Sequence, residues 1–231
     1  MQDVECRQPH TTKVSIISTD HAAAAQPSEA PVDPQPRAPV DPQGSIAEGR
    51  DALREALRAA ASALKADGVP FALAGSYALW VHGAPEGDHD VDLAIAEGSV
   101  EAAAGSLAAA GFAIERPPED WLLKAYRGAA MVDVIHRLVG EPIDADRIAE
   151  APERDVVGLR IPVMAPTEVM ITKLRSMTEQ YCDFTALLPS ARAVREQLDW
   201  PRLRRETSDN PYAEAFVFLL ERLGVAPPAD A

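Results

Sequence analysis

The sequence predicts an α/β (α+β) fold in which a mixed sheet flanked by helices is followed by a C-terminal helical bundle. Short apolar runs of strand length, such as Phe71–Ala74 and Val91–Ala96, alternate with helical patterns up to about residue 165. From Pro166 onward the segments all have helical spacing. The chain of 231 residues is 47% hydrophobic, which allows a sizeable core. We expect four regions: a disordered tail 1–44, an α/β domain 45–165, a helical domain 166–225 and a disordered end 226–231.

The charge and composition narrow the classes of partner. The net charge of −14 disfavours a nucleic acid, because phosphate neutralisation needs clustered Lys and Arg, but it is compatible with a nucleotide carried with Mg²⁺. Cys6 and Cys182 indicate neither a disulfide framework nor a zinc site. Apolar runs stay shorter than a membrane span, and no signal peptide is evident, so we expect a cytoplasmic protein without a membrane partner.

The first part of the ordered chain reads as helix, strand, short helix and strand. Ser45 has the position of an N-cap with Glu48 three residues later, and Gly68 suits the end of that first helix. Phe71–Ala74 is a short strand, after which Ser76 is expected to cap a brief helix running to about His82. Val91–Ala96 is the second strand.

The remaining elements are predicted from periodicity and from Gly and Pro punctuation. They are an Ala-rich helix ending at Gly111, strands in 112–116, 121–128 and 129–138, a short helix 143–151, a last strand or hairpin 156–163, and helices in 166–177, 181–198, 200–207 and 210–224.

An unusual pair of acids stands in the second strand. Side chains alternate between the two faces of a strand, so Asp90 and Asp92 share one face while Val91 and Leu93 face the core. Two carboxylates that repel each other need compensation, and a shared Mg²⁺ or Mn²⁺ ion would supply it. A calcium loop does not fit, because Leu93 stands where that loop requires Gly and Ser99 where it requires Glu.

Two further features add to this predicted metal site. Asp133 lies between Val132 and Val134 in another strand, a costly position for a carboxylate unless that strand lies beside the acid pair. Gly75-Ser76 turns a strand sharply into a helix, which presents N–H groups and a hydroxyl to a phosphate. The exposed strand end and the ordinary helix start are the alternative interpretations.

Together, the strand, Gly75-Ser76, the acid pair and the later lone Asp133 resemble the DNA polymerase β-like nucleotidyltransferase superfamily over about residues 50–165. Downstream, Lys173-Leu174 and Asp183 resemble the abortive-infection (AbiEii-type) toxin branch. The resemblance implies a minimal nucleotidyltransferase fold that moves a nucleoside monophosphate from an NTP such as ATP to an acceptor hydroxyl on a protein, an RNA end or a small molecule.

The resemblance also implies roles for the residues. Asp90, Asp92 and Asp133 would be the catalytic and metal-binding residues, and Gly75, Ser76, Lys173 and Asp183 would bind the nucleotide. The stretches after Gly75-Ser76 and before Asp90 contain none of the Arg or Lys common in the superfamily, and the Arg-x-Lys that often precedes the downstream Asp is absent as well. Lys173, and less so Lys124, are candidates to supply the missing charge.

Alternatives remain open at this point. The chain has either kept its catalytic activity or become a degenerate nucleotide-binding module, for example the partner in a toxin–antitoxin pair. Asp183 can also be read as the N-cap of the helix that begins at Phe184. For Trp121 and Tyr181 we expect packing in the core rather than a place in the site.

Overall fold

A mixed sheet of five strands carries the predicted acids. The computed structural model describes residues 42–228. The sheet has the order β1-β2-β5-β4-β3, and only the central pair β2 and β5 is parallel. The strands are β1 (Phe71–Leu73), β2 (Val91–Ile95), β3 (Ala113–Glu115), β4 (Leu122–Arg127) and β5 (Ala130–Ile135).

The register of the central strands decides which side chains meet. Asp92 of β2 is paired with Asp133 of β5, and Lys124 of β4 is paired with Asp133 from the other side. Residues in register on neighbouring strands project to the same face of a sheet. Asp92, Asp133 and Lys124 therefore lie side by side on one face, and this arrangement is the frame of the site.

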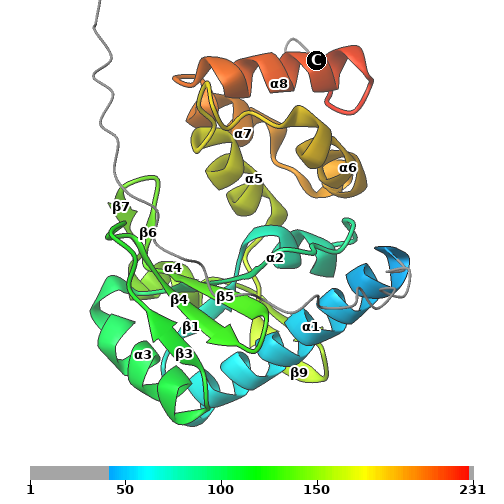
Figure 1. Cartoon of the computed structure of the whole chain (residues 1–231). Helices are drawn as coiled ribbons and strands as arrows, with labels where there is room; N and C mark the ends of the chain where they lie inside the picture. Colours follow the sequence, from blue (N-terminus) through cyan, green and yellow to red (C-terminus); the bar gives the residue numbers. More distant parts are fainter. Residues whose placement is uncertain (1–41, 229–231) are drawn as a thin grey trace, which may run out of the picture. The chain divides into compact units, whose positions relative to one another are not determined.

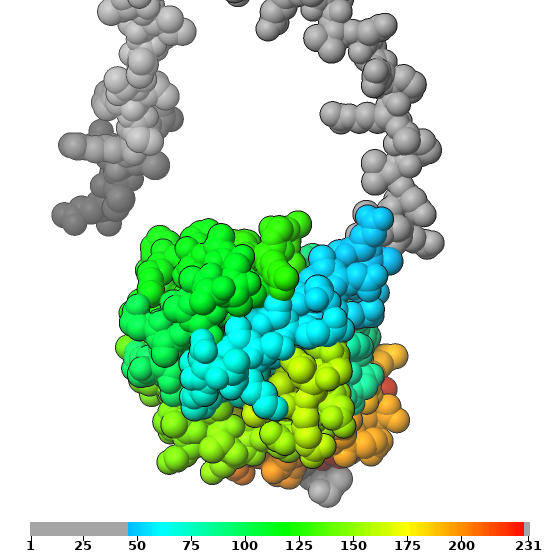
Figure 2. Space-filling model, turned by 90° about the horizontal axis from the view of Figure 1, so that it is seen from below, coloured from blue at the N-terminus to red at the C-terminus, as the bar shows by residue number. Residues whose placement is uncertain are grey.

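The opposite face of the sheet is covered by two helices, α1 (Pro42–Ala66) and α3 (Val100–Ala109), the latter preceded by a 3₁₀ turn at Glu97–Ser99 (Figure 1). Helix α1 contacts β5, α3 and β9 (Leu159–Pro162). Figure 2 shows α1 lying across this face between the α3 region and the hairpin that β8 (Glu153–Val156) forms with β9. Arg58 and Lys65 of α1 donate hydrogen bonds to the carbonyl oxygens of Val157 (2.9 Å) and Arg160 (2.9 Å) in that hairpin.

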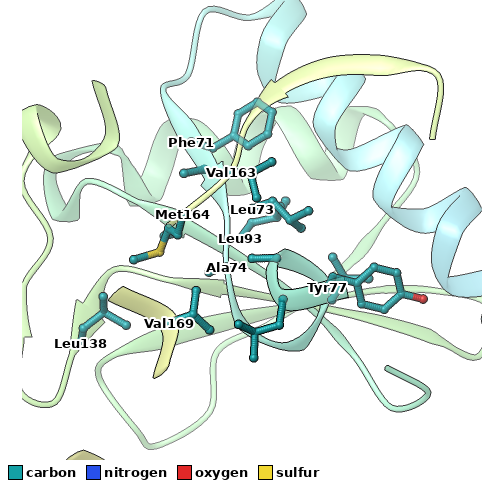
Figure 3. Close-up of a cluster of buried hydrophobic side chains, with 14 of the residues drawn as sticks. Phe71, Leu73, Ala74, Tyr77, Leu93, Leu138, Val163, Met164 and Val169 are labelled. Carbon is teal, nitrogen blue, oxygen red and sulfur yellow. The ribbon is translucent and has the colours of Figure 1, made fainter. Parts of the chain in front are cut away.

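The predicted alternation in the second strand is present. Val91 and Leu93 are fully buried, as are Val132 and Val134 of β5. A second part of the core surrounds the end of β1, where apolar side chains of several elements pack together (Figure 3). It includes Leu73, Leu93, Tyr77, Val163, Met164 and Val169. Burial of each large apolar side chain contributes roughly 1.5–3 kcal/mol, which is what allows the sheet to hold charged residues on its other face.

The C-terminal part is helical, as the spacing predicts. It consists of α5 (Pro166–Arg175), α6 (Phe184–Val194), a 3₁₀ turn (Arg195–Gln197), α7 (Trp200–Thr207) and α8 (Pro211–Arg222). Asp183, Asp199 and Asn210 cap α6, α7 and α8, each with a side-chain oxygen that accepts from backbone N–H groups in the first turn. Helix α5 contacts α2 (Gly75–Val81), α7 and α8, so it joins the helices to the sheet.

Several element bounds differ from the prediction. Helix α1 begins at Pro42, so Ser45 lies inside the helix and is not its N-cap, and residues 42–44 of the predicted tail are helical. The rest of that tail and residues 229–231 lie outside the described residues. Helix α2 begins at Gly75, with Ala74 at the N-cap, so Ser76 does not cap it. A side chain at the second helical position cannot accept from the first turn as an N-cap does.

The region after β5 also differs from the prediction. The single strand predicted over 129–138 ends at Ile135, and Arg137–Leu138 forms a separate hairpin strand, β6, with β7 (Glu141–Pro142). The turn is made by Val139 and Gly140, both with positive φ. Helix α4 spans Ala145–Ala149, and the hairpin β8 (Glu153–Val156) and β9 (Leu159–Pro162) begins earlier than predicted.

An ionic network fixes α5, the helix that carries Lys173. Glu168 of α5 pairs with Arg147 of α4 (2.6 Å) and with Arg202 of α7. Burial raises the pKa of Glu168, but the two guanidinium groups lower it by a larger amount. The pKa of Glu168 therefore lies below the ordinary value.

The division of the chain at residue 165 stays a prediction. No helix in the 42–228 stretch is both long enough and apolar enough to pass through a membrane.

We predict that Glu168→Gln lowers the free energy of unfolding by about 1–2 kcal/mol at pH 7, because two charge-assisted contacts weaken. Because the folded-state pKa of Glu168 is depressed, its contribution is present above the unfolded-state pKa and is lost as pH falls through the folded-state value. Urea unfolding at pH 7 and pH 3 measures both effects. Glu153→Gln, which removes an exposed pair with Arg160, is the control and should cost less than about 0.5 kcal/mol. Equal losses for the two variants would contradict the prediction.

Candidate metal centre and phosphate site

The three predicted acids converge. Asp90, Asp92 and Asp133 each offer one carboxylate oxygen, and these oxygens all lie within 4.8 Å of one another. Asp133 is buried, while Asp90 and Asp92 are partly exposed. Carboxylate oxygens that converge in this way are able to share a divalent metal ion after a small adjustment of their side chains. Their roles in metal binding and catalysis stay predictions.

Local contacts hold the loop that leads into the acid pair. Glu86, in the loop 83–90, accepts hydrogen bonds from Arg54 of α1 at 2.7 Å and 2.5 Å and from the Tyr77 hydroxyl at 3.5 Å. Burial raises the pKa of Tyr77 far above its ordinary value, and the negative charge of Glu86 adds to this shift. The phenol therefore stays protonated and keeps donating. The loop is thus tied to two helices directly before Asp90.

Gly75 makes room for the carboxylate of Asp92. A Cβ built on Gly75 would lie 1.6 Å from Oδ2 of Asp92, and the φ of Gly75 is +57°. Both the space and the left-handed backbone therefore require glycine here. Gly75 is predicted to bind phosphate, and it also allows α2 to begin directly against the acid cluster.

Lys173 supplies a positive charge at the Gly75-Ser76 bend. Its Nζ donates a hydrogen bond to Oγ of Ser76 at 3.2 Å, although the two residues lie 97 positions apart in the chain. The ammonium group is also close enough to Asp92 to lower the pKa of that carboxyl. A hydroxyl and an ammonium group at this bend are a suitable pair of donors for a phosphate.

Lys124 supplies a second positive charge, on the other side of the cluster. Its Nζ lies 3.1 Å from Oδ1 and 3.3 Å from Oδ2 of Asp133 and 3.5 Å from the sulfur of Met131. Burial lowers the pKa of Lys124, but the hydrogen bond and the charge of Asp133 outweigh burial and raise it overall. Both lysines that the sequence analysis named as candidates thus contact predicted site residues.

The cluster perturbs its own carboxyl groups. Burial raises the pKa of Asp92 to about 7, and the charges of Asp90 and Asp133 add to this effect, while Lys173 and Lys124 oppose it. Burial also raises the pKa of Asp133, against the hydrogen bond from Lys124. Carboxyl groups with a raised pKa are held ionised at a cost, which a bound cation would relieve.

The donor set fits a hard divalent cation. The site offers carboxylate oxygens without nitrogen or sulfur ligands from the three acids, which is the chemistry that Mg²⁺ and Mn²⁺ prefer. With all groups ionised, the three acids exceed Lys124 and Lys173 by one negative charge. The residues present therefore fit the ion that the resemblance implies.

Lys173 lines two cavities. One, of about 330 Å³, is bordered by Asp92 and Gly75 and is otherwise mainly apolar; Trp121 and the side chains of Leu138, Met164 and Val169 line it, the last three labelled in Figure 3. The other, of about 250 Å³, is more polar and is lined by Ser76, Tyr181 and Asp183, among others.

Asp183, Trp121 and Tyr181 each border one of the two cavities. Asp183 accepts hydrogen bonds from the N–H groups of Thr185 (2.9 Å) and Ala186 (3.0 Å), so it is the N-cap of α6 while it also borders the polar cavity. The expectation that Trp121 and Tyr181 pack in the core is wrong. They are 41% and 79% exposed and line the cavities, because each lies in a loop rather than on the buried face of an element.

Comparison with known proteins identifies the fold. The chain is similar to the crystal structure of ANT(2″)-Ia in complex with adenylyl-2″-tobramycin, with a TM-score of 0.52 and 15% identity over 72% of this chain and 97% of that one. The solution structure of the antibiotic-resistance factor ANT(2″)-Ia gives a TM-score of 0.50, with 12% identity over 74% and 96%.

The chain has a nucleotidyltransferase fold. This confirms the predicted fold class, whereas the abortive-infection branch stays a prediction. A weaker likeness is to the lincosamide antibiotic adenylyltransferase LnuA with lincomycin bound, with a TM-score of 0.44 and 12% identity over 59% and 92% of the two chains. No protein-family model matches the sequence, and no curated protein matches it either.

We predict that Gly75→Ala lowers the free energy of unfolding by about 2 kcal/mol or more and weakens Mn²⁺ binding at least about tenfold, because the new methyl group displaces the Asp92 carboxylate. Gly68→Ala is a matched control, since Gly68 has a φ of +67° but nothing within 4 Å of its Cβ position. It should lose about 1 kcal/mol and bind Mn²⁺ as the parent does. Unfolding curves and Mn²⁺ titration give both quantities, and unchanged Mn²⁺ affinity in Gly75→Ala would contradict the prediction.

We predict that Asp92→Asn stabilises the protein in chelator, and more so at higher pH. The folded-state pKa of about 7 lies above the ordinary value, so the folded state holds an extra proton between roughly pH 4 and 7 and loses stability as pH rises through this window. The gain from Asp92→Asn should be about 1–3 kcal/mol larger at pH 8 than at pH 5. Denaturant titrations at both values measure it, and a gain independent of pH would speak against the raised pKa.

Proposed function

We propose that this protein transfers a nucleoside monophosphate from an NTP to a hydroxyl group of an acceptor. One observation carries the proposal. Asp90, Asp92 and Asp133 meet within 4.8 Å next to the Gly75-Ser76 bend, where Lys173 contacts Ser76. Acidic side chains beside donors for phosphate are the arrangement that phosphoryl-type transfer needs, because catalysis there depends on positioning and charge stabilisation.

The cofactor would be Mg²⁺ or Mn²⁺, held by Asp90 and Asp92 with Asp133 beside them. When bound, such an ion neutralises phosphate charge and stabilises the entering and leaving oxygens of an in-line displacement. The protein supplies the rest of the positive charge. The ammonium group of Lys173 and the hydroxyl of Ser76 would orient the β- and γ-phosphates, and Gly75 leaves room for the Asp92 carboxylate next to them.

The proposed reaction is a single displacement at the α-phosphorus. The acceptor hydroxyl gives its proton to the carboxylate of Asp133, and its oxygen forms a bond to the α-phosphorus. The bond from that phosphorus to the bridging oxygen breaks, and pyrophosphate leaves with the bonding electron pair. Lys124, which contacts both oxygens of Asp133, would hold this carboxylate in place.

ATP is the first nucleotide to test. The crystal structure of the fold neighbour ANT(2″)-Ia is a complex with adenylyl-2″-tobramycin, which carries an adenylyl group. The apolar cavity of about 330 Å³ next to Asp92 has the size for part of a small molecule, which supports a small-molecule acceptor over an RNA end or a protein. The net charge of −14 also disfavours a large RNA.

The second candidate is a degenerate nucleotide-binding module, such as a toxin–antitoxin partner. One observation favours it. Among the described residues, the stretches beside Ser76 and before Asp90 offer no Arg or Lys, so contacts to a triphosphate depend on Lys173 alone at the bend. The abortive-infection branch belongs with this candidate.

We predict that the parent protein transfers label from α-labelled ATP and Mg²⁺ to an acceptor, tested with pools of hydroxyl-bearing small molecules, RNA and proteins. Asp90→Ala should lower the rate on the order of 10³-fold or more, because it removes one of the three converging carboxylates. Asp88→Ala is the matched control. Asp88 is an exposed acid two residues away and outside the cluster, so its loss should change the rate less than about threefold.

The outcomes separate the two candidates. Transfer by the parent and by Asp88→Ala, but not by Asp90→Ala, supports the enzyme. Binding of ATP without transfer to an acceptor in the three pools, with any of the four NTPs as donor, would support the module instead.

A further inference from the structure

A lysine contacts the third carboxylate of the cluster through both of its oxygens. Nζ of Lys124 lies 3.1 Å from Oδ1 and 3.3 Å from Oδ2 of Asp133, and its side chain is 24% exposed. The contact is built into the sheet, because Lys124 and Asp133 are paired across the antiparallel strands β4 and β5. The position of the ammonium group therefore depends on strand register and not on a mobile loop.

A metal ion shared by Asp133 would have to lie beside this ammonium group. Both oxygens of Asp133 already accept from Lys124, so an ion there would either displace the lysine or meet its charge at close range in a partly buried site. Asp90 and Asp92 differ in this respect. Asp90 directly precedes β2, and Asp92 is the second residue of that strand. Among the described residues, the side chains of Asp90 and Asp92 accept no hydrogen bond.

The charges around the site also separate Asp133 from Asp90 and Asp92. On the side of β4, Lys124 neutralises Asp133. On the side of β1, Lys173 acts on Asp92, but its hydrogen bond goes to Ser76 rather than to a carboxylate. The uncompensated negative charge therefore lies with Asp90 and Asp92, and the place that the general two-ion arrangement gives to a second cation already holds a positive group.

We propose that Lys124 replaces the second metal ion, so that this protein holds one divalent ion, on Asp90 and Asp92, and uses the ammonium group of Lys124 as the fixed cation beside Asp133. The inference rests on the proposed function and deepens it. Lys124 acts here as a positioning residue, since it acts through the carboxylate of Asp133. A one-ion site should need less free metal than a two-ion site to become occupied.

The test counts Mn²⁺ ions bound per chain by electron paramagnetic resonance, with the full chain and Mn²⁺ alone as the probe. Asp92→Asn gives the background from other surface acids, which is subtracted. We expect one specific ion for the parent and for Lys124→Arg, which keeps a cation. We expect two for Lys124→Met, or a single ion bound at least about tenfold more tightly. Lys65→Met, which removes a lysine on α1 that bonds to Arg160, should behave as the parent does.

The outcomes distinguish failure of this inference from failure of the proposed function. Two specific ions in the parent overturn the role of Lys124 and leave the transferase proposal intact. A Lys124→Met variant that binds Mn²⁺ as the parent does also overturns it. Absence of specific binding in every protein overturns both. If Lys124→Met does not fold, the count for the parent and for Lys124→Arg still decides between one ion and two.

Discussion

Repulsion among three neighbouring carboxylates sets what the residues around the site have to provide. Asp90, Asp92 and Asp133 are held within 4.8 Å by two strands whose parallel pairing puts Asp92 directly beside Asp133. The apolar side chains that alternate with these acids are fully buried against the other face of the sheet, and their burial offsets the electrostatic cost. The pairing of β2 with β5 therefore brings the acids together.

Three residues around the acids make their close approach possible. Gly75 leaves room for the Asp92 carboxylate, Lys173 places a positive charge at the adjoining bend, and Lys124 neutralises Asp133. Each comes from a different element, and α5, which carries Lys173, is fixed in turn by the ionic network around Glu168. The helical part of the chain therefore completes the charge balance of a site that lies on the sheet.

The sequence predicted what depends on local chemistry. Alternation in a strand placed Asp90 and Asp92 on one face, the cost of an isolated Asp133 indicated a neighbouring acidic strand, and the capping role of Asp183 was readable from its position before a helix. The rest depends on tertiary contacts. The contact of Lys124 follows from the register of two strands, which a single sequence does not fix, and the exposure of Tyr181 follows from where its loop lies.

A crystal grown with Mn²⁺ would show whether the acid cluster is a cation site. We expect an anomalous scattering peak about 2 Å from carboxylate oxygens of both Asp90 and Asp92, on the face of the sheet that also carries Asp133. A map with Mn²⁺ peaks at other acids of the chain, and with Asp90 and Asp92 bonded only to water or to lysine, would contradict it.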